Sequence, residues 1–178
     1  MGVAETRLTA ETFEELAMPL FDQLYNFAHW LAQDRTEAED LVQETYVKAL
    51  KGFSSFQAGT NFCAWMYRIL RNTFLTSRTG LKASAIIALD ADDGPELSAG
   101  PETPETIFIE HSQHQVLQAA IEALPVHFRE VLLLCEVEEM SYQEIAEALS
   151  IPIGTVMSRL ARARKALRES LQQKLVRS

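Results

Sequence analysis

Hydrophobic positions recur at helical spacing in the first part of the chain. Apolar side chains follow one another three or four residues apart over 13–31, again over 41–50 and again over 62–74. This spacing gathers apolar side chains on one face of a helix. It predicts three amphipathic helices, the first running without a break from Thr12 to about residue 33.

Polar residues predict where these helices begin and end. Thr12–Glu15, Thr36–Glu39 and Ser141–Glu144 each have the capping-box pattern, in which a hydroxyl and a carboxylate satisfy exposed backbone N–H groups. Asn61 is a suitable cap for the third helix. Gly52 favours the end of the second helix.

The helical pattern stops and then returns later in the chain. Residues 83–111 are rich in Asp, Glu, Pro and Gly, which is typical of a flexible linker. Beyond the linker, the pattern predicts helices over 116–124 and 128–137, a short helix to Leu149 and a last one from Gly154. The fold class expected is all-α, with two small helical domains, 1–82 and 112–178, joined by the acidic linker.

The stretch 141–167 has the pattern of a helix-turn-helix, in which the second helix enters the major groove of DNA. Val156 and Leu160 are expected to face the first helix. We expect the polar side chains of the second helix on its other side, with Thr155, Ser158, Arg159 and Arg162 near base edges and Arg164 and Lys165 near phosphates. The alternative is an ordinary helical hairpin with a solvated basic face.

The charge is segregated along the chain. The net charge is −9, which by itself argues against a nucleic-acid partner. Residues 45–89, however, carry six bases and no acid, and residues 159–178 carry seven bases and one acid. Two basic blocks between acidic ones indicate two contacts with polyanions and other surfaces for a different partner.

Several classes of protein are disfavoured. No stretch approaches the ~20 apolar residues that a membrane span needs, and no signal pattern opens the chain, so we expect a cytoplasmic protein without membrane insertion. Cys63 and Cys135 lie in apolar helical contexts and are expected to be buried. Glu110, His111 and His114 lack the spacing of common metal sites. We expect no cofactor, no metal and no enzymatic activity.

The second half resembles region 4 of the extracytoplasmic-function (ECF, group 4) sigma factors of RNA polymerase. The resemblance lies in Ser141–Leu149, in Ile153–Arg164 and in the upstream Leu124–Leu132. It implies a domain that reads the minus-35 promoter element. In this interpretation Met157 joins Ser158, Arg159 and Arg162 at the DNA, although the family often has a basic or polar residue at the position of Met157.

The first half resembles region 2 of the same family. Glu39–Tyr46 is similar to the segment that docks on the clamp helices of the polymerase β′ subunit, which implies polymerase contacts by Asp40, Gln43 and Glu44 on one helical face. Asn61–Asn72 is similar to the segment that reads and melts the minus-10 element. The residues implied there are Asn61, Arg68, Arg71, Asn72 and Arg78. Trp65 is expected in the core rather than at an unstacked base.

The resemblance also implies the partners. They are core RNA polymerase, through its β′ clamp helices and β subunit, promoter DNA and an anti-sigma factor. The linker is expected either to mimic nucleic-acid phosphate in the polymerase cleft or to act as a solvated tether. A stand-alone helix-turn-helix regulator, with residues 1–80 as a ligand or dimer domain, is the alternative function.

Overall fold

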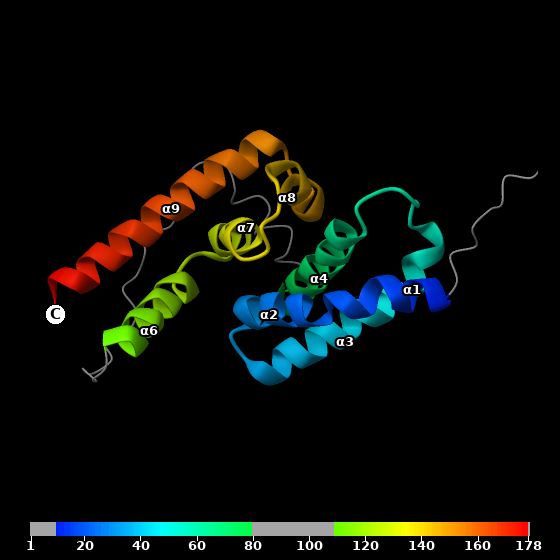
Figure 1. The fold of residues 1–178 in the computed structure, drawn as a ribbon, viewed down its shortest axis with the longest axis horizontal. Helices are drawn as coiled ribbons and strands as arrows, with labels where there is room; N and C mark the ends of the chain where they lie inside the picture. Colours follow the sequence, from blue (N-terminus) through cyan, green and yellow to red (C-terminus); the bar gives the residue numbers. More distant parts are fainter. Residues whose placement is uncertain (1–9, 80–108, 178) are drawn as a thin grey trace, which may run out of the picture. The chain divides into compact units, whose positions relative to one another are not determined.

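The computed structural model describes residues 10–79 and 109–177, and every regular element in these two ranges is a helix (Figure 1). This confirms the expected all-α class. The chain divides into two compact units, the first containing the N-terminal helices and the second most of the C-terminal ones. Most of the linker predicted over 83–111 lies outside the described residues. Its last residues are helical, since a helix begins at Ile109. No helix in the described part of the chain combines the length and apolarity required to cross a bilayer.

The predicted first helix is interrupted. The structure has α1 (Ala10–Ala17), a 3₁₀ turn, η1 (Met18–Leu20), and α2 (Phe21–Ala32). The prediction of one helix capped by Thr12 is therefore wrong on two counts, since Thr12 lies inside α1. Pro19 accounts for the break, because proline has no backbone N–H and its ring clashes with the preceding helical turn.

The next two helices of the first unit begin at side-chain caps. Asp34, and not Thr36, caps α3 (Arg35–Gly52), since its Oδ1 accepts the N–H of Glu37 at 2.8 Å. The predicted end of α3 at Gly52 is confirmed, and the turn η2 (Phe53–Ser55) follows. Asn61 caps α4 (Phe62–Thr79) as predicted, because its side chain accepts the N–H of Ala64 at 3.0 Å.

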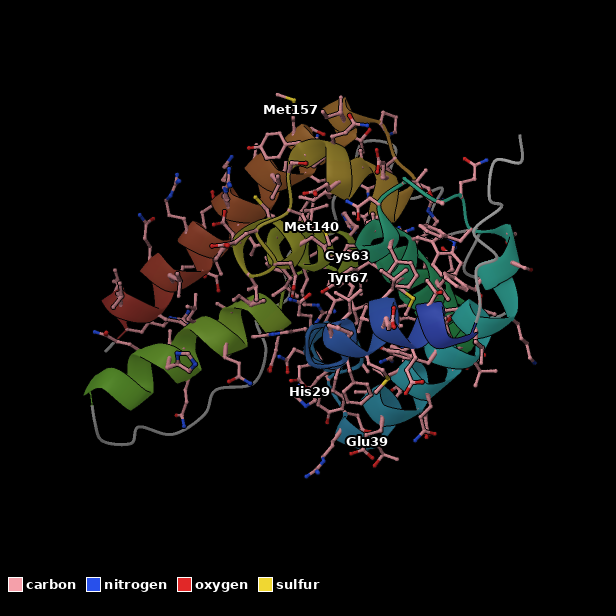
Figure 2. The ribbon with its side chains drawn as sticks, turned by 45° about the vertical axis from the view of Figure 1, so that its right-hand side comes forward. His29, Glu39, Cys63, Tyr67, Met140 and Met157 are labelled. Atoms are coloured by element: carbon pink, nitrogen blue, oxygen red, sulfur yellow. The ribbon has the colours of Figure 1, made fainter. Side chains whose placement is uncertain are left out.

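The core of the first unit lies between α2, α3 and α4. Its fully buried side chains include Leu24, Phe27, Val42, Met66 and Leu70. Tyr67 is also fully buried and meets Phe27 edge to face at 5.1 Å between ring centroids (Figure 2). Tyr46 joins α3 to the end of α1, since its hydroxyl donates to the carbonyl of Ala17 at 2.6 Å. Burial, and to a smaller extent the charge of Asp22, raises the pKa of Tyr46 to about 12.

The C-terminal helices are α6 (Ile109–Glu122), α7 (Val126–Glu136), α8 (Tyr142–Leu149) and α9 (Ile153–Val176), and the second unit contains all of them except the end of α8 from Glu147. The long α9 runs beside α7 and α6 (Figure 1). Pro125 precedes α7, where the fixed φ of proline suits a helix start. The core of this unit is apolar, and its buried members include Leu124, Val131, Leu134, Val156 and Leu160.

The predicted capping box at α8 is confirmed. The N–H of Glu144 donates to Ser141 Oγ at 3.1 Å, and the N–H of Ser141 donates to Glu144 Oε2 at 2.7 Å. Ser141→Ala should therefore lower the free energy of unfolding by ~1 kcal/mol, as measured by urea denaturation. Ser54→Ala, which removes an exposed hydroxyl from η2, is the control. Equal unfolding free energies for Ser141→Ala and the unmodified chain would contradict the capping role.

Candidate nucleic-acid interface

A tight turn joins α8 to α9. Ser150 has a left-handed backbone with φ of 56°, and the N–H of Ile151 donates to the carbonyl of Ala146 at 3.1 Å. This bond, which reaches back five residues past a left-handed one, has the Schellman form that ends a helix. Pro152 then precedes the first turn of α9. The local geometry is thus helix, short turn, helix, as the sequence predicts for 141–167.

The first two turns of α9 have distinct inner and outer sides. Val156, Leu160 and Ala163 are buried in the second unit. On the outer side, Met157 is 54% exposed and protrudes from the start of the helix (Figure 2). Ser158 and Arg162 are exposed with it, and Thr155 is partly exposed. The structure therefore brings four of the residues predicted for minus-35 contacts onto one accessible side: Thr155, Met157, Ser158 and Arg162.

Arg159 is buried, contrary to the expectation that it lies near base edges on the accessible side of α9. It is only 5% exposed, and its Nη1 lies 4.0 Å from Oε1 of Glu130, which is 1% exposed. A side chain in this position is directed into the protein, where it makes an ion pair with α7. The expectation that Arg159 shares the outer side of α9 with Arg162 is thus corrected.

Arg164 and Lys165 follow on the exposed part of α9, as expected for phosphate contacts. Arg164 is already paired, because its Nη2 lies 2.7 Å and its Nε 3.1 Å from Oε1 of Glu136. The hydrogen bond to Glu136 is the main cause that raises the pKa of Arg164. A DNA phosphate that binds Arg164 must therefore compete with a carboxylate of the protein itself.

This competition can be measured. Glu136→Gln should raise non-specific affinity for duplex DNA several-fold and steepen the slope of log affinity against log salt by about one unit, because one more cation can release a counterion. Fluorescence anisotropy over a salt series is the measurement. Glu169→Gln, the same change in charge at an exposed position of α9, is the control. Identical salt slopes for the two variants would contradict the competition.

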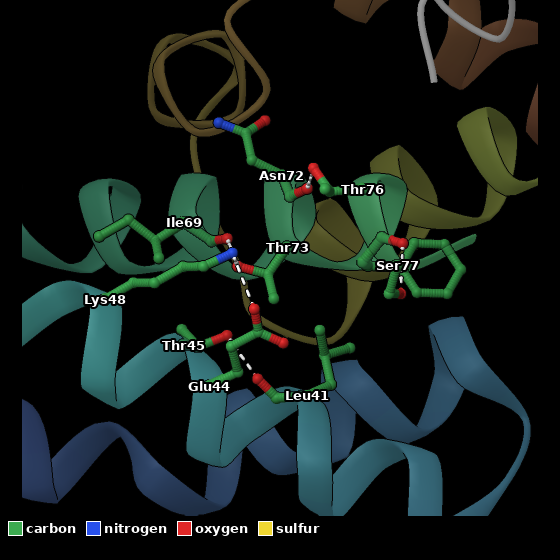
Figure 3. A network of polar contacts seen from close by, with 10 residues as sticks. Leu41, Glu44, Thr45, Lys48, Ile69, Asn72, Thr73, Thr76 and Ser77 are labelled. Carbon is green, nitrogen blue, oxygen red and sulfur yellow. Dashed lines mark hydrogen bonds and ion pairs between the residues drawn. The ribbon is translucent and has the colours of Figure 1, made fainter. Parts of the chain in front are cut away.

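The residues expected at the polymerase lie on the outer side of α3. Asp40, Gln43 and Glu44 are all exposed. Lys48 Nζ forms an ion pair with Glu44 Oε1 at 3.0 Å. It also donates a hydrogen bond to Thr73 Oγ1 of α4 at 3.4 Å (Figure 3). This chain of contacts ties Glu44 to α4. It also lines one side of a shallow cavity of about 250 Å³ between Lys48, Ile69, Asn72, Thr73 and Thr76.

Two exposed apolar residues on α3 complete this side of the helix. Val47 is 51% and Leu50 is 50% exposed. They follow Gln43 at intervals of four and three residues, so they continue its stripe along the helix. The apolar spacing over 41–50 instead predicts that Leu50 lies on the buried face. The sequence pattern gives little indication that Leu50 is exposed, because the side of α3 that becomes buried depends on how α2 and α4 pack against it.

The residues expected at the minus-10 element come from α4 and its cap. Asn61 is at the start of the helix, and Arg68 and Asn72 follow within three turns. Arg71 is only 8% exposed and its Nη1 donates to the carbonyl of Leu149 at 3.3 Å, so the expectation that it is accessible to DNA is corrected. Asn72 is exposed. Trp65 is partly exposed rather than fully in the core as expected, and its ring centroid lies 5.1 Å from that of Phe56 and 5.6 Å from that of Phe62.

Arg78 is held away from the other cations of α4. Its Nη2 donates to the carbonyl of Ala32 at 3.1 Å, its Nε lies 3.4 Å from Glu37 Oε1, and its guanidinium lies 5.2 Å from the ring centre of Phe74. These contacts join the end of α4 to the turn between α2 and α3. Arg78 therefore packs within the first unit while its side chain stays 45% exposed, and its predicted minus-10 contact stays a prediction.

Other candidate chemistry is limited. Across the described ranges, no group of three or more His, Cys, Asp and Glu side chains is arranged to hold a metal. Of the three residues weighed as metal ligands, only His114 has a described side chain, and it is exposed. Cys63 and Cys135 are partly exposed rather than fully buried.

Comparisons with known proteins place both halves of the chain. Residues 16–83 match the family described as Sigma-70 region 2, and residues 114–167 match the one described as Sigma-70, region 4. The ECF RNA polymerase sigma factor SigE of Mycolicibacterium smegmatis is 35% identical over 162 residues, which cover 90% of this chain and 62% of that relative. This chain thus spans less than two thirds of SigE.

Two further proteins match over nearly their full length. The ECF RNA polymerase sigma factor SigW of Bacillus subtilis is 31% identical over 170 residues, covering 91% of this chain and 90% of SigW. The sigma factor RpoE of Bartonella quintana, solved with the anti-sigma factor NepR, matches with a TM-score of 0.67 and 29% identity over 92% of this chain and 98% of that one.

These findings decide between the two functions that the sequence left open. A stand-alone regulator needs only the helix-turn-helix, whereas residues 16–83 match Sigma-70 region 2. The stand-alone interpretation is therefore set aside, and the resemblance noted in the sequence is confirmed. The two sigma regions in this order, with the identity to SigW over nine tenths of both chains, show that the chain belongs to the extracytoplasmic-function sigma factors of RNA polymerase.

Proposed function

We propose that this chain is a group 4 sigma factor that binds core RNA polymerase in the cytoplasm and directs transcription from promoters with its own minus-35 and minus-10 elements. The observation that carries the proposal is the outer side of α9, where Met157, Ser158 and Arg162 are exposed at the start of the second helix of a helix-turn-helix. The N-terminal residues of such a helix are the ones that reach base edges in the major groove.

Each half of the chain has a separate role in this proposal. Residues 112–178 read the minus-35 element through α9, with Arg164 and Lys165 contacting phosphates. In residues 1–82, α3 docks on the polymerase through Asp40, Gln43 and Glu44. The cap residue Asn61 and the α4 side chains Arg68 and Asn72 contact the minus-10 element, where cations and amides can hold a separated strand.

The outer side of α3 suits a polymerase partner chemically. Its acidic and amide groups complement a basic helix, and the exposed Val47 and Leu50 add apolar area beside them. Interfaces commonly have apolar anchors next to polar groups that fix orientation. We therefore extend the docking face to Val47 and Leu50.

Regulation by an anti-sigma factor is part of the proposal. RpoE of Bartonella quintana has been solved with such a partner, and the same kind of protein would control this chain by covering surfaces that the polymerase needs. As a sigma factor the chain contributes binding and recognition and leaves the chemistry of RNA synthesis to the polymerase.

The direct test combines binding and transcription. The purified chain should be captured by immobilised bacterial core RNA polymerase, and the reconstituted enzyme should give discrete new run-off transcripts on genomic DNA. Sequencing their start sites would give the two promoter elements. Failure to bind polymerase, together with a specific shift of duplex DNA by the chain alone, would contradict the proposal.

A further inference from the structure

The second unit contains a buried ion pair between the helix before the helix-turn-helix and the recognition helix itself. Glu130 on α7 is 1% exposed and Arg159 on α9 is 5% exposed, with 4.0 Å between Oε1 and Nη1. Both charges lie on buried stretches of their helices, since Val131 on α7 and Val156 and Leu160 on α9 are also buried.

Joining two helices by a buried ion pair carries a large desolvation penalty. Taking two charges out of water costs several kcal/mol each, and well-packed apolar residues in their place are often as stable or more stable. Stability alone therefore does not account for charges at positions 130 and 159. What an ion pair adds is direction, because it forms in one relative orientation, whereas Val156, Leu160 and Ala163 can slide against an apolar surface.

Orientation matters on this helix because its two sides differ so sharply. Successive residues of an α-helix are ~100° apart, so a rotation of α9 by one residue would carry Met157 and Arg162 away from the outer side. The same rotation would separate Arg159 from Glu130 and break the buried ion pair. The pair thus favours the observed rotational setting of α9.

The neighbouring residue extends this arrangement to α6. Arg129, also only 5% exposed, donates from Nη1 to the carbonyl of Glu122 at 3.0 Å, at the last residue of α6. Two adjacent charged residues on α7 therefore hold the end of one helix and the rotational setting of another. Figure 1 shows α7 with α6 and α9 beside it.

We propose that Arg159 is a positioning residue, which acts through Glu130 to hold α9 with Met157, Ser158 and Arg162 facing the minus-35 element. The inference rests on the proposed function. In this proposal Arg159 does not contact a base directly. It affects promoter recognition only by orienting the residues that do.

A double-mutant cycle in the full chain with core polymerase tests the proposal. The variants are Glu130→Leu, Arg159→Met and both together. The readouts are the melting temperature and the ratio of run-off transcription from the cognate promoter to that from promoters with one changed minus-35 base pair. Each single change should lower the melting temperature by ~10 °C or more, because it removes one partner of a buried ion pair.

The double variant separates positioning from stability. It should melt within a few degrees of the unmodified chain and yet discriminate between promoters ~10-fold less well. A double variant with both the melting temperature and the discrimination of the unmodified chain would overturn the proposal. Val131→Ala, which removes apolar volume beside Glu130, should lower the melting temperature and leave discrimination unchanged when measured well below it. Equal loss of discrimination in Val131→Ala would also overturn the proposal.

A milder change makes the test independent of how well the double variant folds. Glu130→Gln removes the charge but keeps the size of the side chain, and it should reduce discrimination as Arg159→Met does, several-fold. If Glu130→Gln discriminates normally while Arg159→Met does not, Arg159 acts on DNA directly and the proposal is wrong. An unmodified chain that ignores the minus-35 sequence would instead contradict the proposed function, so the two failures are distinct.

Discussion

Replacing Asp40 and Glu44 together by lysine should lower the affinity for core RNA polymerase about 100-fold, or ~3 kcal/mol. Both carboxylates are exposed on α3 and adjoin the apolar Val47 and Leu50. Lysine at both positions would put like charges against the basic partner helix expected there, and it would remove the ion-pair partner of Lys48. Biolayer interferometry with immobilised core polymerase is the measurement.

The change in net charge needs its own control. Glu14→Lys with Glu15→Lys makes the same change in charge on the exposed part of α1, and it should leave the affinity within about threefold of the original. Circular dichroism should show that both double variants keep their helices. If the Asp40/Glu44 variant bound polymerase normally, the docking face would have to lie elsewhere on the chain.

Arg162→Ala should weaken selection of the cognate promoter by ~1–3 kcal/mol, the usual contribution of a guanidinium that pairs with a base edge. Arg162 is exposed on the same side of α9 as Met157 and Ser158. The loss should be confined to one or two base pairs of the minus-35 element, because a base contact is local. Run-off transcription from promoters changed one base pair at a time measures this profile.

Lys165→Ala separates base reading from attraction to the backbone. Lys165 is exposed further along α9, so its loss should weaken all promoters alike and reduce the salt dependence of binding by about one unit. A uniform loss for Arg162→Ala, with no change in base preference, would assign Arg162 to a phosphate instead.

The helices of this chain are predictable because each has a long apolar stripe, but their first residues are less so. Asp34 and Thr36 are both good caps within three residues of each other, and the choice between them depends on which backbone N–H groups remain exposed. Similarly, the periodicity of 13–31 does not register Pro19, because apolar residues continue on both sides of it. The spacing of apolar residues shows which face of a helix is buried. It does not show a local interruption of that helix.

The side that each functional residue occupies is harder to predict than the helix on which it lies. The sequence placed Arg159 with Arg162, three residues apart on a basic helix, because arginine is rarely buried without a partner. That partner, Glu130, lies on a different helix, so local spacing carries no information about it. Leu50 shows the reverse case, since this apolar residue fits the predicted buried stripe of α3 and yet is 50% exposed.

The contact from Glu44 through Lys48 to Thr73 has a consequence for the order in which partners bind. It ties an anionic side chain of the proposed polymerase face to the helix that holds the proposed minus-10 residues. In the free protein the carboxylates of this face, Asp40 and Glu44, repel a DNA strand that approaches α4. When a basic helix of the polymerase neutralises them, that repulsion is removed, and linkage requires the two ligands to favour each other. The first unit would then couple polymerase capture to strand binding through its charges alone, without any change in shape.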